Sequence, residues 1–202
     1  MEPYRVFEKV ISEDKILRIT IGYDSDADDP RDWSNIGHMI CWNNRYKLGD
    51  KHTYCHPEEL ENLFAKMKED GEEVLISPLY IYDHSGISIY MEEPAFDYGG
   101  WDTSRVGYFY ILKKDVFENY PEATEESWKE LAQTVLKGEL EEYDLYIRGE
   151  VYGLLIEEVS HCTNCGHELT ALTERVSGFY GFESVEEGIK EEGYELSEFE
   201  EL

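Results

Sequence analysis

The amino-acid sequence predicts an α+β protein with a single domain, a mainly antiparallel sheet, two or three helices and an acidic C-terminal segment. Three observations support this prediction. Of the 202 residues, 41% are hydrophobic and 14% aromatic, enough to form a folded core. The expected order of elements, β-β-α-β-β-β-α-β-β-α, favours antiparallel pairing. No repeat and no Ser- and Gly-rich linker divides the chain, so we expect one domain over residues 1–182 and an acidic helix and tail over 183–202.

The elements of the first 112 residues follow from apolar patterning and from turn residues. Strands are predicted where apolar residues alternate or cluster with β-branched and aromatic ones, over residues 16–21, 36–42, 74–82, 87–91 and 106–112. Asp-His-Ser-Gly at 83–86 predicts a hairpin turn between two of these strands. Pro57 suits a first helical position, and Asp70 with Gly71 ends the helix that follows it.

The remaining residues are expected to mix helices with one strand pair. Asp115 to Asn119 predicts a short helical turn, which Pro121 interrupts. A longer helix is expected to start near Thr124, and Gly138 weakens the expectation that it is unbroken. An antiparallel strand pair and a final acidic helix are predicted over residues 151–159, 169–179 and 184–196.

Charge restricts the possible partners of this chain. It has 46 acidic and 18 basic residues and a net charge of −28. Such a chain repels nucleic acid and anionic membranes, so we expect no direct nucleic-acid binding, no membrane contact and a basic protein partner. No apolar run approaches the ~18 residues that span a bilayer, and no secretory signal is visible. Together with only four cysteines, these features favour a cytoplasmic setting.

Two segments concentrate the acidic residues and predict a partner-binding surface. Residues 115–149 hold ten acidic and three basic residues, and residues 183–202 hold nine and one. Carboxylates along a helix can approach the charge spacing of duplex DNA, so we expect an acidic mimic that occupies a nucleic-acid-binding cleft. The alternative is that the acidity serves solubility alone. The expected contact residues are Glu125, Glu126, Glu130, Glu139, Glu141, Glu142, Asp144, Glu186, Glu187, Glu191 and Glu192.

One cysteine pair has the spacing of a metal site. In Cys162-Thr163-Asn164-Cys165-Gly166, two thiolates at i and i+3 can share one tetrahedral ion, as in a zinc knuckle. The candidate ligands of one structural zinc are Cys162, Cys165, His161 and His167, with Cys55 and His56 available only if the fold brings them close. Reduced thiols at a hairpin tip and a redox-active pair remain as alternatives.

Two polar turns form an alternative, catalytic site. Asp83 and His84 lie in one turn, and Asp102 and Ser104 lie in another. Neighbouring residues cannot form a hydrolytic triad by themselves, because a triad needs groups that converge from separate elements. Two turns at one sheet edge could meet and form the pocket of a small enzyme. A further alternative is a metal-stabilised adaptor that binds a basic protein without mimicking nucleic acid.

Several stretches resemble a family of small acidic proteins that bacteriophages and conjugative plasmids encode. They are residues 30–37 (PRDWSNIG), 41–52 (CWNNRYKLGDKH), 79–87 (LYIYDHSGI), 101–102 (WD), 106–107 (VG), 142–144 (EYD) and 149–153 (GEVYG). The resemblance covers roughly residues 16–182 and transfers no catalytic residue. Residues 176–181 (VSGFYG) lack the Cys-Trp pair that often precedes the final Gly-Phe-Tyr-Gly in that family. The resemblance implies a mobile-element protein in the cytoplasm of a bacterial host, where acidic proteins often block restriction or CRISPR-type defences.

Overall fold

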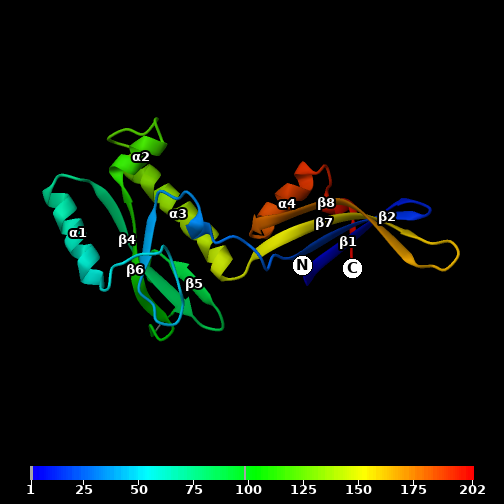
Figure 1. Ribbon diagram of the computed structural model, residues 1–202, viewed down its shortest axis with the longest axis horizontal. Coiled ribbons are helices and arrows are strands. Elements are labelled where there is room, and N and C mark those ends of the chain that lie inside the picture. The colour runs from blue at the N-terminus through cyan, green and yellow to red at the C-terminus, as the bar shows by residue number, and fades with distance from the viewer. Residues whose placement is uncertain (1, 98) are drawn as a thin grey trace. The chain divides into compact units, whose positions relative to one another are not determined.

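The computed structural model describes residues 2–97 and 99–202, which form four helices and nine strands in two antiparallel sheets (Figure 1). The predicted α+β class with mainly antiparallel pairing is therefore confirmed. The chain divides into two compact units. The terminal unit comprises the residues up to Asp28 together with Gly149–Leu202, and the central unit comprises Asp29–Arg148.

The terminal unit contains a five-stranded sheet in the order β8-β7-β2-β1-β9, in which every neighbouring pair is antiparallel. Its elements are β1 (Glu2–Ser12), β2 (Lys15–Tyr23), β7 (Val151–His161), β8 (Glu168–Tyr180), α4 (Phe182–Glu191), the 3-10 turn η2 (Leu196–Glu198) and β9 (Glu200–Glu201). Ile19 and Ile21 of β2 and Leu154 of β7 are fully buried, and they share one core with Val185 and Ile189 of α4. This alternation along the strands buries one sheet face beneath the helix.

The central unit contains a four-stranded sheet in the order β3-β6-β4-β5. Its elements are η1 (Pro30–Asp32), β3 (His38–Cys41), α1 (Pro57–Glu69), β4 (Val74–Asp83), β5 (Ile87–Tyr90), β6 (Thr103–Leu112), α2 (Lys113–Asn119) and α3 (Trp128–Ile147). Phe109 of β6 packs against Leu136 of α3, whereas the next residue, Tyr110, contacts Phe64 of α1. Helices therefore cover both faces of this sheet (Figure 1), which explains why β6 is apolar on both sides.

Two expectations about α3 are changed by its surroundings. The helix begins at Trp128, and Thr124 and Ser127 hydrogen-bond each other's backbone N–H groups in the turn that precedes it. Gly138 does not interrupt it, although glycine costs about 1 kcal/mol relative to alanine inside a helix. Burial of Leu136 and Leu140 on either side of Gly138 outweighs that cost.

The sequence prediction missed strands β1 and β9 in the terminal unit. β1 pairs with β2 through two register shifts, so its apolar residues do not alternate cleanly along the chain. β9 has two residues and pairs with Phe7 and Glu8 of β1. The structure places α4 and β9 in the same compact unit as β1, β2, β7 and β8. The boundary at residue 182 stays a prediction.

Candidate functional site

The outer side of α4 carries a row of exposed carboxylates, which we call the α4 acidic face. Val185 and Ile189 anchor the inner side of the helix in the core of the terminal unit. Gly188 allows close packing, since a Cβ atom there would lie 2.5 Å from the ring of Phe179. The opposite side and the C-cap are exposed, and their acidic residues are Glu183, Glu186, Glu187, Glu191 and Glu192.

The charge density of this face is close to that of one nucleic-acid strand. Residues 183–192 hold five Glu and one Lys, a net charge of −4. At a rise of about 1.5 Å per residue they extend over about 15 Å, or one net charge in about every 4 Å. One strand of duplex DNA carries a charge every ~3.4 Å.

The carboxylates of the α4 acidic face are not neutralised by ion pairs. The pairs of this unit use other carboxylates, and they are Arg5–Glu201, Lys9–Glu198, Lys15–Glu158, Arg18–Glu8 and Arg18–Glu168. Among residues 2–97 and 99–202, none pairs with a carboxylate of the α4 acidic face. Lys190 is the single basic residue of α4. Outside the helix, the pKa of Arg5 is raised by Glu201 and more weakly by Glu186, so in the described part of the unit Glu186 alone of this face is attracted by a neighbouring cation and the rest of its charge is directed to solvent.

The predicted contact residues of the central unit form a less uniform surface. Glu126 and Glu130 are exposed. Glu125 bonds to Lys113, and Glu141 lies 3.6 Å from Lys137. These local pairs reduce the charge that a partner would meet. Burial raises the pKa of Glu142, and the neighbouring carboxylate of Glu139 raises it further.

Two of the predicted contact residues are used inside the central unit. The Oδ1 atom of Asp144 accepts the backbone N–H of Ile89 at 2.9 Å, and Oδ2 pairs with Arg148 at 3.2 Å. Glu139, with a side chain only 13% exposed, pairs with the buried Arg31. Helical spacing showed that these residues share a helix with exposed acids, but it did not show that they face inward.

Arg31 is the centre of a buried polar network that sequence reasoning did not identify. Its side chain is 3% exposed and bonds through Nε to Asp50 at 2.8 Å and through Nη1 to Glu139 at 2.9 Å. Nη2 donates to the carbonyl of Gly37 at 2.7 Å, and the guanidinium carbon lies 5.3 Å from the ring centroid of Phe109. Each nitrogen of the buried guanidinium therefore donates a hydrogen bond, which offsets the cost of burying the charge.

Both carboxylates of this network also hold backbone. Glu139 Oε1 accepts the N–H groups of Ile36 and Gly37 at 3.1 Å, and Asp50 Oδ2 accepts that of Met39 at 2.8 Å. The signal in the sequence was a single arginine, Arg31, among the five aspartates of residues 24–32. Arg31 and Gly37 lie in the stretch 30–37 and Asp50 lies in the stretch 41–52, two of the stretches that carry the family resemblance. These stretches therefore supply much of the buried network.

The two polar turns lie next to each other, but only some of their candidate side chains are in contact. His84 Nδ1 lies 2.9 Å from Asp102 Oδ2, and the backbone N–H of Asp83 donates to the carbonyl of Asp102 at 2.8 Å. The carboxylate of Asp83 is held instead by Arg45 Nη1 at 2.7 Å and by the hydroxyl of Tyr46. Ser104 is exposed and pairs with Ile81 in the β4–β6 ladder. His84 and Asp102 are thus the one side-chain contact among the four candidate residues.

The turn between β7 and β8, where the zinc ligands were predicted, is closed by two backbone hydrogen bonds. Cys162 N–H donates to the carbonyl of His167, and Gly166 N–H donates to that of Cys162, both at 2.8 Å. The backbone N–H groups of Asn164 and Cys165 hydrogen-bond the Cys162 sulfur and lower the pKa of that thiol. In the described part of the chain, no group of three or more His, Cys, Asp or Glu side chains is arranged to hold a metal ion. Cys55 and His56 belong to the central unit.

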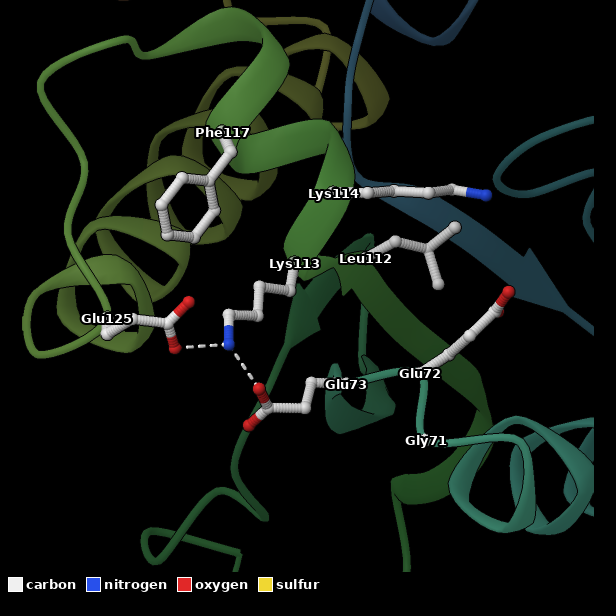
Figure 2. A pocket seen from close by; sticks show the side chains of 8 residues that line it. All are labelled: Gly71, Glu72, Glu73, Leu112, Lys113, Lys114, Phe117 and Glu125. Carbon is white, nitrogen blue, oxygen red and sulfur yellow. Dashed lines mark hydrogen bonds and ion pairs between the residues drawn. The ribbon is translucent and has the colours of Figure 1, made fainter.

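A pocket of about 310 Å³ lies in the central unit beside the start of α2 (Figure 2). Lys113 donates from its ammonium to Glu73 and Glu125, and this group lies 5.9 Å from the ring centroid of Phe117. Lys114 points away from these side chains (Figure 2). Because the hydrogen bonds of Lys113 are made within the pocket, we assign it no ligand.

Comparisons with known proteins give no information on the function of these sites. No protein-family model, curated protein or solved structure matches the chain. Among the described helices, none has both the length and the apolar character needed to cross a membrane.

Proposed function

We propose that this protein is an acidic mimic of nucleic acid, and that its α4 acidic face occupies the DNA- or RNA-binding cleft of a basic host protein. The observation that carries the proposal is the position of the charges. Five exposed, unpaired carboxylates follow one helix whose other side is anchored in the core. A solvated helix usually carries both signs, whereas here Lys190 is the one basic residue of α4.

In this proposal the α4 acidic face takes the place of the DNA phosphates, so the same electrostatic forces would drive binding. A cleft that normally receives phosphates is rich in Lys and Arg, and it releases bound ions when an anionic surface enters it. A preformed helix with about one net charge per 4 Å can displace one strand's phosphates without ordering a flexible chain. The binding should therefore weaken steeply as the salt concentration rises.

The class of target follows from the sequence resemblance. Proteins encoded by phages and conjugative plasmids meet host systems that cut foreign DNA, and those systems bind DNA or RNA in basic clefts. A restriction enzyme or a CRISPR effector is therefore the proposed partner class, which makes this protein a counter-defence inhibitor.

The experiment begins with capture from a bacterial lysate at low and at high salt. Each retained protein is identified, purified and mixed with a fluorescent duplex DNA or RNA, and the chain is then titrated into that complex. The proposal expects displacement of the nucleic acid, with an apparent affinity that falls at high salt. A captured protein whose nucleic-acid binding is not competed contradicts the proposal.

A charge-matched pair of variants tests the position of the site. The first variant carries E186Q, E187Q, E191Q and E192Q on the α4 acidic face. The control carries E92Q, E93Q, E118Q and E122Q, all exposed in the central unit and without ion pairs among the described residues. Both variants lose four negative charges, yet we expect at least tenfold weaker competition only from the first. Equal competition by the two variants would show that net charge, and not the α4 acidic face, causes the displacement of nucleic acid.

A catalytic site at the polar turns is the second candidate, favoured by the contact between His84 and Asp102. A carboxylate that holds one imidazole nitrogen orients the ring for proton transfer at the other. Hydrolysis of p-nitrophenyl acetate is a simple probe: H84A and D102N should lower the rate at least tenfold. H56A, at an exposed histidine on α1's N-cap, should not. Equal rates for all of these proteins would exclude this candidate.

A further inference from the structure

The turn at residues 161–168 is a protruding end of the terminal sheet. Ser160 of β7 is the last residue that pairs with β2, opposite Lys15, so residues 161–168 extend beyond the neighbouring strand. The β7–β8 hairpin reaches its tip there (Figure 1). Cys165 is exposed and Cys162 is partly exposed, and both are free thiols. Two thiol groups therefore lie at the tip of this hairpin.

The backbone of the turn holds the two cysteines close together. Cys162 N–H donates to the carbonyl of His167 and Gly166 N–H donates to that of Cys162, both at 2.8 Å. Gly166, at φ = 71°, supplies the left-handed residue that brings the chain back to Cys162. This arrangement places two thiols where a single ion could bind both.

One chain, however, supplies too few ligands for a closed site. A structural zinc ion takes four ligands in a tetrahedron. Around Cys162 and Cys165 the described residues provide no third His, Cys, Asp or Glu in position. The two thiols are therefore two of the four ligands that such an ion needs.

We propose that two copies of this chain join tip to tip and bind one Zn²⁺ through Cys162 and Cys165 of each copy. A twofold axis through the ion would relate the two hairpins, which is the usual symmetry of a homodimer. Four thiols give up four protons as they coordinate the ion, with Zn–S distances of about 2.3 Å. The ion and the four thiolates together carry a charge of −2, so the site needs surroundings of low negative charge.

The tip meets that requirement, although the chain as a whole is strongly acidic. Residues 159–173 contain a single acidic residue, Glu168, in a chain that has 46. Glu168 is paired with Arg18 at 2.7 Å. Leu169 and Leu172, exposed by 53% and 62%, follow the turn on β8 and offer apolar surface for contact. Two copies that meet at this tip therefore repel each other less than two copies that meet at the α4 acidic face.

Metal titration combined with sedimentation tests the proposal on the whole, reduced protein. Co²⁺ serves as the probe because thiolate ligation gives it tetrahedral visible bands and a sulfur-to-metal charge-transfer band, and Zn²⁺ should displace it. We expect saturation at one metal per two chains, with a doubling of mass that a chelator reverses. C162S and C165S should each abolish both signals, whereas C55S, at an exposed cysteine of the central unit, should change neither.

Three results would overturn the proposal. A monomer that binds one metal ion would show that one chain closes the site. Loss of the Co²⁺ bands in H161A or H167A would show ligation by a neighbouring histidine. Absence of metal binding by the reduced protein would show that Cys162 and Cys165 are thiols without a metal-binding role. The variant of the α4 acidic face should still dimerise, so this test is independent of the proposed mimicry.

Discussion

The guanidinium of Arg31 and the carboxylate of Glu139 form a buried ion pair, with 2.9 Å between Nη1 and Oε2, across 108 residues of sequence. The pair connects the 3-10 turn η1 to the middle of α3. Asp50 completes the network from a third segment. Because each partner is also hydrogen-bonded to backbone, we regard the network as the feature that fixes these three segments together.

Removal of Arg31 should destabilise the protein far more than removal of a surface cation. R31A would leave Glu139 and Asp50 without their partner, and breaking a buried pair in this way costs about 3–5 kcal/mol. K51A is the control, because Lys51 and Asp32 form a pair that is 90% and 65% exposed and worth about 0–1 kcal/mol. Denaturant unfolding gives both values. Equal losses would show that the Arg31 network adds no stability beyond a surface pair.

Two Gly→Ala substitutions should have opposite effects on stability. A Cβ atom at Gly37 would lie 2.7 Å from Glu139 Oε2 and 2.8 Å from the Phe109 ring, so G37A must displace this packing, at a cost of about 1–3 kcal/mol. Gly138, inside α3, has nothing within 4 Å of its Cβ position. G138A should therefore gain about 0.5–1 kcal/mol. Thermal unfolding measures both, and a destabilised G138A would show that the glycine has a role of its own.

The raised pKa of Glu142 predicts a pH-dependent effect of E142Q. Burial and Glu139 favour the protonated carboxyl in the folded protein. The folded state then binds more protons than the unfolded state between the two pKa values, so stability falls as the pH rises from the ordinary glutamate pKa through the folded one. E142Q should remove that loss. We expect E142Q to have a higher free energy of unfolding than the parent at pH 7. At a pH below both the folded and the unfolded pKa of Glu142, the two proteins should not differ in this way.

E126Q serves as the matched control for E142Q, because Glu126 is an exposed residue of the same unit. An equal pH profile for the two variants would contradict the assigned burial of Glu142.

Salt should stabilise this protein, and part of that effect should come from α4. Raising the salt from about 0.01 M to 0.15 M shortens the screening length from ~30 Å to ~8 Å. Like charges four residues apart, such as Glu187 and Glu191, cost about 0.2–0.5 kcal/mol each in a helix. The variant with four Gln on the α4 acidic face should therefore melt higher than the parent at low salt, with a smaller rise on salt addition. A parent melting temperature that does not change with salt would contradict this expectation.

Local patterns were sufficient for most elements of the fold. Apolar alternation identified β2, apolar runs rich in β-branched and aromatic residues identified β4 and β5, and a strand pair was expected where β7 and β8 lie. The residues Pro57 and Gly71 marked the two ends of α1. These features are encoded within a few residues, because side-chain periodicity and backbone turn preferences act over that distance. The same reasoning placed Cys162 and Cys165 at a hairpin tip, which the structure confirms.

Contacts between distant segments were decided only by the tertiary structure. In the sequence, Glu139 and Glu141 are both acidic residues of one predicted helix. In the structure, Glu139 bonds to Arg31 in the interior, whereas Glu141 is exposed. The inward or outward direction of a carboxylate depends on which chain segment packs against its helix. Likewise, His84 and Asp102 meet because β4 and β6 pair, which places Tyr82 opposite Thr103 after a register shift at Tyr80. Composition and spacing determined the charge and the elements of this protein, whereas long-range packing decided which charges are neutralised and which remain exposed on α4.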